Sequence, residues 1–252
     1  MTIKRLVQVL FAGLLLVAAL TSLIVWWARD SRRDLVEIER SLFVSYKLAD
    51  ELRQTSDDLT RFARTYVVSG DPRFEQYFRD VLAIRGGTMP RPVHSERIYW
   101  DFFVDEGRAP RPSTAPVPLL QLMEQEGFTD EELSKLRQAE ATSDALVQIE
   151  ETAMHAMKGK FRDASGAFTV SGSPDQATAI RLMHDAAYHR EKARIMAPID
   201  EFLGMVDDRA NARLDAFHRD TAFAFRLIQG LLVIFVAIVA ASYAILRRRL
   251  PG

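Results

Sequence analysis

The stretch Ile199-Asp-Glu-Phe-Leu-Gly-Met-Val-Asp-Asp-Arg-Ala-Asn-Ala-Arg-Leu-Asp-Ala-Phe217 is the most informative part of this chain. Its apolar residues recur at alternating steps of three and four, with charged residues between them: Ile199, Leu203, Val206, Ala210, Leu214 and Phe217. This spacing predicts a helix with one apolar stripe, close to the 3.5-residue period of supercoiled helical bundles. We expect this helix to begin at Pro174 and to run unbroken to Phe217.

Two apolar runs near the ends of the 252-residue chain are long enough to cross a membrane. Residues 6–27 and 227–246 contain no charged side chain, and about 20 apolar residues in a helix span the hydrocarbon core of a bilayer. A cleaved signal peptide is an alternative for the first run, although that run exceeds the roughly 7–15 apolar residues usual in such peptides. Trp26-Trp27 at its end suit a membrane interface. We therefore predict two transmembrane helices, the second joined to the stripe described above.

Basic residues flank both runs on the side of the chain ends, because Lys4-Arg5 precede the first and Arg247-Arg-Arg249 follow the second. The positive-inside rule then places residues 1–5 and 247–252 in the cytoplasm and residues 28–226 outside, in the periplasm of a bacterial inner-membrane protein. Without these five cations, the 33 basic residues fall to 28 against 34 acidic ones. This balance gives nucleic-acid binding no support. The absence of cysteine excludes disulfides and thiolate metal sites.

The region between the two runs has the pattern of an all-α domain. Heptad spacing predicts a helix over 31–68, with the stripe Leu35, Ile38, Leu42, Ser45, Ala49, Leu52, Ser56, Leu59, Ala63 and Tyr66. Ser69-Gly-Asp-Pro72 is expected to end this helix and to start a short aromatic one that reaches about Ile84, with Asp71 as N-cap.

Residues 86–118 differ in composition from the helices on either side. Three Pro-x-Pro segments surround the aromatic stretch Ile98-Tyr-Trp-Asp-Phe-Phe103. A long connection without regular structure is usually functional or disordered, and so many aromatic residues argue against disorder. We therefore expect an ordered insert that docks on the helices.

Beyond the insert, residues 119–126 predict a short helix, and Thr129-Asp-Glu-Glu132 has the capping signature of a long one that reaches about Ala164. Val68-Ser-Gly-Asp-Pro72 recurs as Val170-Ser-Gly-Ser-Pro174, which makes Ser173 the expected N-cap of the last helix. Chance or convergent capping chemistry is an alternative explanation of this repeat. In either case both turns should lie at the end far from the membrane, in an elongated up-down-up-down four-helix bundle whose second helix is partly replaced by the insert.

Side chains at similar distances from the two turns form a candidate ligand-binding layer, made of Arg61, Arg64, Tyr66, Tyr77, Arg181, His184 and Tyr188. Arginines converging between helices could bind a small anion such as a carboxylate, because a guanidinium offers paired donors. The alternative is that these side chains point to water or pair with the many acidic residues. Tyr99-Trp100-Asp101 could form a wall over a ligand, including a cationic one, or an aromatic plug that seals the open side of the bundle.

The sequence contains no catalytic grouping, so we predict neither an enzyme nor a cofactor. It has no Gly-rich phosphate loop and no Gly-x-Ser-x-Gly motif. His184 and His189 lie on different faces of a helix because they are five residues apart, so we expect no metal site.

Three segments resemble the four-helix-bundle sensor domains of bacterial transmembrane receptors: Ala63-Arg-Thr-Tyr-Val-Val-Ser-Gly-Asp-Pro72, Ile98-Tyr-Trp-Asp-Phe102 and Ala187-Tyr-His-Arg-Glu-Lys-Ala-Arg-Ile-Met-Ala-Pro198. This group includes chemotaxis transducers and the extracytoplasmic regions of sensor histidine kinases and diguanylate cyclases. The resemblance covers about residues 28–226 and implies a homodimer that senses a small ligand and drives a cytoplasmic output module. The sequence ends at Leu250-Pro-Gly252, where a HAMP linker or output domain would begin, so we expect the output module in a longer chain or in a partner.

Our interpretation from sequence is therefore the signal-sensing region of a two-pass membrane receptor. An alternative is a periplasmic protein–protein interaction module in which the insert contacts a partner protein. A structural spacer between membrane and periplasm is a third possibility.

Overall fold

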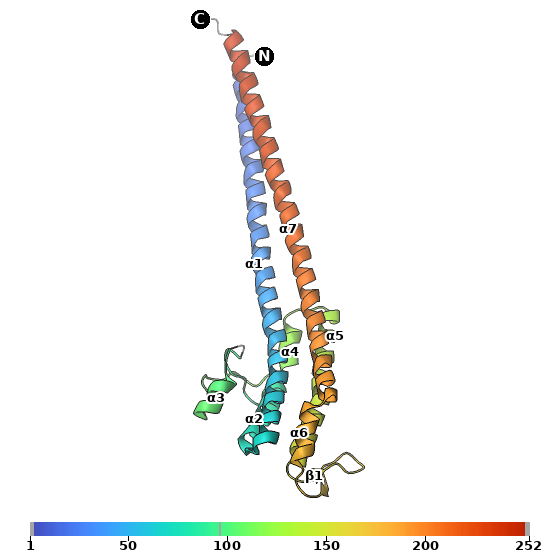
Figure 1. The fold of residues 1–252 in the computed structure, drawn as a ribbon. Helices are drawn as coiled ribbons and strands as arrows, with labels where there is room; N and C mark the ends of the chain where they lie inside the picture. Colours follow the sequence, from blue (N-terminus) through green and yellow to red (C-terminus); the bar gives the residue numbers. More distant parts are fainter. Residues whose placement is uncertain (1–2, 96, 250–252) are drawn as a thin grey trace. The chain divides into compact units, whose positions relative to one another are not determined.

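The computed structural model describes residues 3–95 and 97–249 and is mostly helical (Figure 1). The helices are α1 (Ile3–Ser69), α2 (Pro72–Arg85), α3 (Trp100–Glu106), α4 (Leu119–Gln125), α5 (Asp130–Ala156), α6 (Gln176–His184) and α7 (Ala186–Arg249). A two-residue antiparallel pair, β1 (Lys160–Phe161) and β2 (Val170–Ser171), is the sheet found in the described residues. The prediction of a mostly helical chain is confirmed. Residues 1–2 and 250–252, which we assign to the cytoplasm from sequence, lie outside the described residues.

The chain divides into two compact units, Met1–Arg40 with Asp208–Gly252, and Ser41–Asp207. The first unit contains the two apolar segments. Val7–Trp27 of α1 and the apolar part of α7 are each long and apolar enough to cross a membrane, and their side chains are almost entirely unburied by protein. Apolar side chains left uncovered over such a length are what a lipid environment accommodates. Two membrane-spanning candidates are thus present, as the sequence predicts.

The apolar stripe predicted for 31–68 belongs to α1, which continues from the first apolar run without a break in helical structure. In the second unit its members are buried, or half-buried in the case of Leu42: Leu42, Ser45, Ala49, Leu52, Ser56, Leu59, Ala63 and Tyr66. The side chain of Leu35 lies outside those the structure describes. The period of the stripe therefore identified the buried face of this helix correctly.

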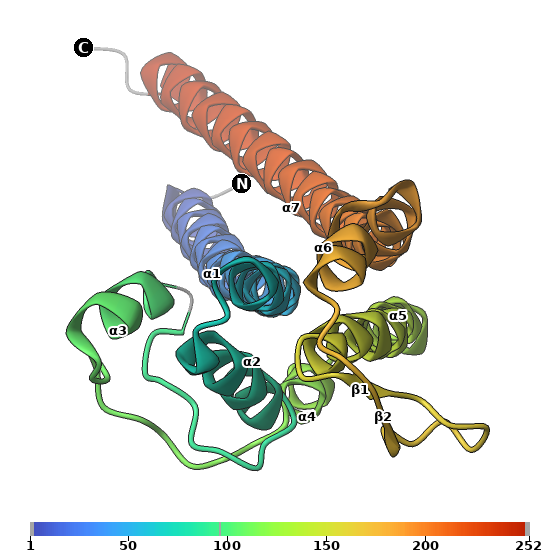
Figure 2. The ribbon, with the colours of Figure 1, turned by 60° about the horizontal axis from the view of Figure 1, so that its bottom comes forward.

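Within Ser41–Asp207, α1, α2, α5 and α6 contribute to a common apolar core, and Figure 2 shows the ribbons of these helices nearly end-on. The largest fully buried side chains of this core come from all of these helices and from the start of α7, for example Phe62, Phe78, Leu136, Met183 and Phe202. Polar contacts tie the same elements together, since the buried Arg85 of α2 donates to Ser143 Oγ of α5 at 2.7 Å.

The first predicted turn has the conformation that its residues favour. Gly70 takes the left-handed φ of +70°, which glycine adopts without a steric cost. Asp71 then accepts a hydrogen bond from the Arg73 amide at 3.0 Å, and Pro72 occupies the first position of α2. The prediction of a glycine end, an aspartate N-cap and a helix over about 72–84 is confirmed.

The start of α5 is also predicted correctly, because Thr129 and Glu132 form a reciprocal capping box. Its end is not: α5 stops at Ala156 rather than near Ala164. Gly159 takes a φ of +62°, and a Cβ on it would lie 2.2 Å from the Gly172 carbonyl oxygen. A chain crossing this close fits only glycine, and it turns the following residues into the β1–β2 hairpin.

The last long helix differs from the prediction at two points. It begins at Gln176, and its N-cap is Asp175, which accepts from the Thr178 amide at 2.9 Å, so Ser173 is not the N-cap. It also breaks at Asp185, whose ψ of 169° separates α6 from α7. The Asp185 carboxylate accepts from the Tyr188 amide at 2.8 Å. An aspartate that caps its own neighbours competes with helical hydrogen bonding, which explains the break.

The repeated Val-Ser-Gly segments therefore have different structures, a helix end at residues 68–70 and a strand at residues 170–171. They nevertheless lie at the same end of the second unit. The side-chain nitrogen Nε2 of Gln176 donates to the backbone carbonyl oxygens of Val67 and Val68 at 3.0 and 3.1 Å. The prediction that both turns share one end is confirmed, whereas the structural repeat is not found.

Candidate functional site

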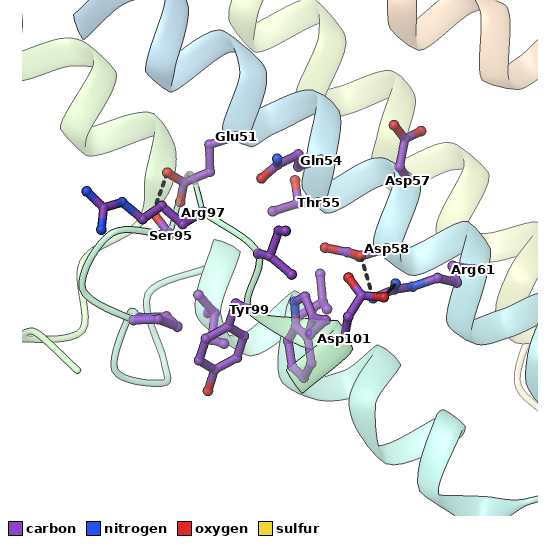
Figure 3. A pocket seen from close by; sticks show the side chains of 15 residues that line it. Glu51, Gln54, Thr55, Asp57, Asp58, Arg61, Ser95, Arg97, Tyr99 and Asp101 are labelled. Carbon is purple, nitrogen blue, oxygen red and sulfur yellow. Dashed lines mark hydrogen bonds and ion pairs between the residues drawn. The ribbon is translucent and has the colours of Figure 1, made fainter. Parts of the chain in front are cut away.

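A cavity of about 240 Å³ lies between α1, α2 and the insert, which we define as residues 86–118 (Figure 3). The part of α1 that faces it contributes polar side chains, and α2 contributes apolar ones. The lining residues are Glu51, Gln54, Thr55, Asp57, Asp58, Arg61, Val81, Ile84, Pro92, Ser95, Arg97, Ile98, Tyr99, Trp100 and Asp101. All of them belong to the second unit.

An ion pair joins the N-terminal part of the insert to α1. Arg91 donates to the Glu51 carboxylate, and the Ser95 hydroxyl donates to the same carboxylate at 2.8 Å. Glu51 is buried, and this burial raises its pKa despite the opposing effect of Arg91. Backbone hydrogen bonds join the N-terminal and C-terminal parts of the insert. In one of them, the Thr114 N–H donates to the Arg91 carbonyl oxygen at 2.7 Å. Residues 86–95 and 97–118 of the insert are thus docked on the helices, as its aromatic composition predicts.

Aromatic rings form the contact between α3 and the core. The Trp100 ring lies 5.2 Å from Phe62 and 6.0 Å from Tyr77, and Phe103 lies 5.4 Å from Tyr77, all measured between ring centroids. Such edge-on and tilted pairs stabilise packing beyond their buried area. Tyr99 and Trp100 also line the cavity. These rings thus pack on the core and line the cavity, and a role as a ligand wall stays a prediction.

One guanidinium connects α1 to α3 at the edge of the cavity. Arg61 Nη2 lies 3.0 Å from an Asp58 oxygen, and Arg61 Nη1 donates to an Asp101 oxygen at 2.7 Å. Asp58 is largely buried, and this burial raises its pKa to about 6, although Arg61 acts in the opposite direction. Figure 3 shows both carboxylates directed toward the same arginine. The arrangement places two acidic groups around one cation.

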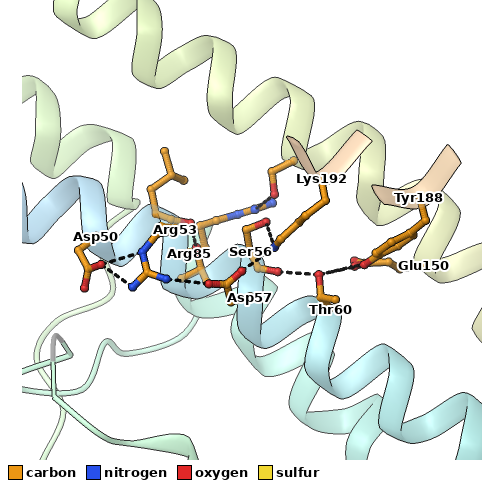
Figure 4. Close-up of polar contacts among 12 residues, drawn as sticks. Asp50, Arg53, Ser56, Asp57, Thr60, Arg85, Glu150, Tyr188 and Lys192 are labelled. Atoms are coloured by element: carbon orange, nitrogen blue, oxygen red, sulfur yellow. Dashed lines mark hydrogen bonds and ion pairs between the residues drawn. The ribbon is translucent and has the colours of Figure 1, made fainter. Parts of the chain in front are cut away.

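A polar network also joins α1 to α5 and α7 (Figure 4). Lys192 of α7 donates to Ser56 Oγ at 2.7 Å and lies 2.9 Å from an Asp57 oxygen. One helical turn away, the Tyr188 hydroxyl donates to the Glu150 carboxylate at 2.6 Å. Burial lowers the pKa of Lys192 and raises the pKa of Tyr188 and that of Glu150, the last to about 7. The Glu150 carboxyl group is thus buried between three helices, whereas Lys192 is half-buried and Asp57 is exposed.

Of the nine residues predicted to bind a ligand, the structure places Arg61, Tyr99 and Trp100 in the lining of the cavity. Tyr77 packs beneath Trp100, and Tyr66 is buried in the core. The remaining four lie elsewhere and do not line the cavity: Arg64, Arg181, His184 and Tyr188.

The contacts of these four explain their positions. The Arg64 guanidinium lies 5.0 Å from the centroid of the Tyr188 ring and donates to the Met183 carbonyl. Arg181 and His184 are exposed and make hydrogen bonds within α6, to Thr178 and to the Ile180 carbonyl. The single anion-binding layer proposed from sequence is therefore divided among separate places in the structure.

The acidic residues Glu51 and Asp58 are functional candidates that sequence reasoning missed, whereas Asp101 was named with Tyr99 and Trp100. Glu51 and Asp58 are seven residues apart on α1, and with Thr55 and Arg61 they form a polar face that resembles an ordinary solvent-exposed one. The signal that could have identified it is the Trp100-Asp101 pair in a long insert opposite such a face. Among residues 3–95 and 97–249, no group of three or more His, Asp or Glu side chains is placed to hold a metal ion.

Comparisons with known proteins give no relative for this chain: no protein-family model, no curated protein and no solved structure matches it. The geometry of the site and the sequence pattern therefore carry the functional argument.

Proposed function

We propose that this chain is the sensing region of a two-pass bacterial membrane receptor, which binds a small molecule in the cavity between α1 and the insert. The cavity itself is the observation that carries the proposal. Its volume of about 240 Å³ is just below the roughly 300–1,000 Å³ typical of sites for drug-sized ligands. Like such sites, it combines apolar side chains with a few polar groups that could fix the orientation of a ligand.

Two neighbouring residues of α1 offer a route from this cavity to α7. Asp58 pairs with Arg61 at the cavity, whereas Asp57 lies 2.9 Å from Lys192 of α7. A ligand that shifts this turn of α1 also changes the surroundings of Lys192. We propose that α7 then moves by about 1–2 Å and that its apolar part passes the movement to a cytoplasmic output module. A useful signal needs about 1–3 kcal/mol of difference in ligand affinity between the two packings.

The membrane setting and the assembly are parts of the same proposal. The two apolar helix segments and the basic residues at both chain ends support a two-pass topology with cytoplasmic termini and a periplasmic region between them. The arrangement of α1, α2, α5 and α6 around one core supports an up-down-up-down four-helix bundle with an insert. The resemblance to bacterial sensor domains adds a homodimer. Gly13 and Gly230 in the apolar segments leave room for a close partner helix.

A protein-interaction module is the second candidate, and the outer surface of the insert favours it. Phe102 is 45% exposed and does not line the cavity, and an exposed apolar side chain on a docked insert can contact a partner protein. This candidate predicts that changes to Phe102 abolish function, whereas the receptor proposal assigns that effect to residues that line the cavity.

A thermal-shift screen of the full chain in detergent micelles tests the receptor proposal. Unfolding would be followed by far-ultraviolet circular dichroism with small acids, amines, amino acids and metal ions. At a hundredfold excess over Kd, a bound ligand stabilises the folded state by about 2.7 kcal/mol, which raises the melting temperature by several degrees.

The matched variants Tyr99→Ala and Phe102→Ala locate the site of any hit. Both remove one aromatic side chain from the insert, but only Tyr99 lines the cavity. We expect the thermal shift to disappear in Tyr99→Ala and to persist in Phe102→Ala. A library without any stabilising compound, or a shift that survives Tyr99→Ala unchanged, would contradict the proposed function.

A further inference from the structure

The cavity is lined by more acidic than basic side chains, namely Glu51, Asp57, Asp58 and Asp101 against Arg61 and Arg97. Two of these carboxylates have cationic partners of their own outside the cavity. Arg91 forms an ion pair with Glu51, and Arg53 and Lys192 both form ion pairs with Asp57. The other two, Asp58 and Asp101, share the single guanidinium of Arg61. At this edge of the cavity, one guanidinium therefore pairs with two carboxylates.

The surroundings of Asp58 show that Arg61 alone does not compensate for its burial. Its carboxylate faces Arg61 on its own helix, Asp101 on α3, the neighbouring Asp57 and Lys192 on α7. The pKa of Asp58 is raised because burial, together with the charges of Asp101 and Asp57, outweighs the effect of the two cations. A second cation close to Asp58 and Asp101 would stabilise both carboxylates in their ionised form, whereas an anion would meet repulsion from both.

The remaining walls suit an apolar group attached to that cation. Val81 and Ile84 of α2 and Ile98 of the insert line the cavity together with the rings of Tyr99 and Trp100. Aromatic rings also attract cations through their negative faces. Metal ions fit less well, because the described residues offer no cluster of three ligating side chains.

We infer that the ligand of this cavity is a small organic cation, an amine or ammonium compound with a compact apolar group, held between Asp58 and Asp101 beside the rings of Tyr99 and Trp100. This inference rests on the proposed function and names the chemical class of its ligand. In the structure, Arg61 occupies the position that the ammonium group takes, so ligand and Arg61 compete for Asp101. Asp101 belongs to the insert, whereas Asp58 and Arg61 belong to α1. When the ligand binds, it therefore replaces the direct ion pair between Arg61 and Asp101 and joins the insert to α1 through its own contacts.

The chain provides its own reporter for this site, because it has three tryptophans and only Trp100 lies at the cavity. In the full chain carrying Trp26→Phe and Trp27→Phe, tryptophan emission then reports on the cavity alone. We would titrate it with three probes of matched shape: benzylamine, which is a cation, benzoate, which is an anion, and benzyl alcohol, which is neutral. Benzylamine is expected to change the emission saturably, and the other two probes are expected to have little effect.

Two variants should change the affinity for benzylamine in opposite directions, which a purely structural role would not produce. Asp101→Asn should weaken binding about tenfold or more, as expected from the loss of a charge-assisted hydrogen bond. Arg61→Gln should strengthen it by up to about fivefold, because an exposed ion pair of about that strength no longer competes. Asp105→Asn, an exposed position of α3 outside the cavity lining, should leave the affinity unchanged.

Each other outcome overturns the inference. Tighter binding of benzoate than of benzylamine would assign the cavity to anions and would leave the receptor function standing. Equal benzylamine affinity in the parent and in Asp101→Asn would remove the proposed cation site. No response to any of the three probes would reject this ligand class, and the broader thermal-shift screen would then judge the receptor function by itself. Circular dichroism of each variant verifies that it is folded.

Discussion

Glu150 of α5 gives a prediction that depends on a single buried carboxyl group. Glu150 is only 1% exposed. Its carboxyl group accepts hydrogen bonds from the hydroxyl groups of Tyr188 and Thr60, at 2.6 and 3.4 Å. These neutral partners offset only part of the cost of burying a charge. Burial accordingly raises the pKa of Glu150 from 4.5 to about 7, against smaller opposing effects of Tyr188 and Lys192.

The direction of the pH effect follows from the two pKa values. The folded protein binds the Glu150 proton more tightly than the unfolded chain does. The resulting stabilisation is fully present below pH 4.5 and is lost as the pH rises through about 7. At about 1.4 kcal/mol for each pKa unit, the loss is on the order of 3 kcal/mol. Asp58, whose pKa is raised to about 6, contributes a change of the same sign at lower pH.

Glu150→Gln keeps the size and hydrogen-bonding capacity of the side chain and removes its titration. Urea unfolding of the full chain in micelles at pH 5 and pH 8 would measure the difference in unfolding free energy between the variant and the parent. We expect Glu150→Gln to be less destabilising, or more stabilising, at pH 8 than at pH 5. The partly exposed neighbour Glu151 serves as control, and Glu151→Gln should follow the parent at both pH values. A difference for Glu150→Gln that is the same at pH 5 and pH 8 would refute the reasoning.

Three further predictions test the elements on which the fold depends. Asp175→Ala should lower the unfolding free energy by about 0.5–2 kcal/mol because it removes an N-cap. Ser173→Ala should lower it by less than about 0.5 kcal/mol. Equal losses for the two variants in urea unfolding would contradict the cap assignment. Gly159→Ala should destabilise the fold by more than about 1 kcal/mol, because Gly159 has a left-handed φ and the added Cβ would lie 2.2 Å from a carbonyl oxygen. Gly204→Ala, at an open helical position, should stabilise the fold by about 0.5–1 kcal/mol. The reverse order in urea unfolding would contradict the close approach of Gly159 to Gly172. Phe202→Ala should cost about 3–5 kcal/mol since this ring is fully buried, and a thermal melt that is unchanged would exclude this core.

The parts of the fold that depend on local chemistry could be predicted from sequence. The stripe of α1 follows from its heptad period, the turn at Gly70 and Asp71 from residues that favour those backbone conformations, and the start of α5 from a capping box. Each of these signals lies within a few residues of the structure that it determines.

The parts that depend on distant contacts could not be predicted in this way. The end of α5 is set by the close approach of Gly159 to Gly172 across the hairpin, and His155 stacks on Phe168 of the same hairpin at 3.8 Å. Neither contact has a signature in the local sequence. The break at Asp185 was missed because the apolar spacing continues across it, although an aspartate able to cap Tyr188 marks the position.

The candidate site was predicted in part for a related reason. The aromatic composition of the Pro-rich insert predicts Tyr99 and Trp100, and the distance from the first turn predicts Arg61. Counting residues from two turns cannot tell on which side of a helix a residue lies, so Arg181 and His184 were grouped with Arg61, although they are exposed on α6. Asp58 was missed because a polar face toward an insert and a polar face toward solvent have the same sequence pattern.

The most direct test of the central claim is whether filling the cavity moves α7. The chain has no cysteine, so Ala145→Cys on α5 and Ala193→Cys on α7, both exposed positions, can carry one pair of spin labels per chain, and an excess of unlabelled chain isolates the distance within one copy. Double electron–electron resonance on the full chain in bilayer nanodiscs would compare the label distance without ligand and with the compound that gives the largest Tyr99-dependent thermal shift. We predict that the distance distribution shifts by about 1–2 Å when the cavity is filled. An unchanged distribution under saturating ligand would contradict the proposal that this cavity signals through α7.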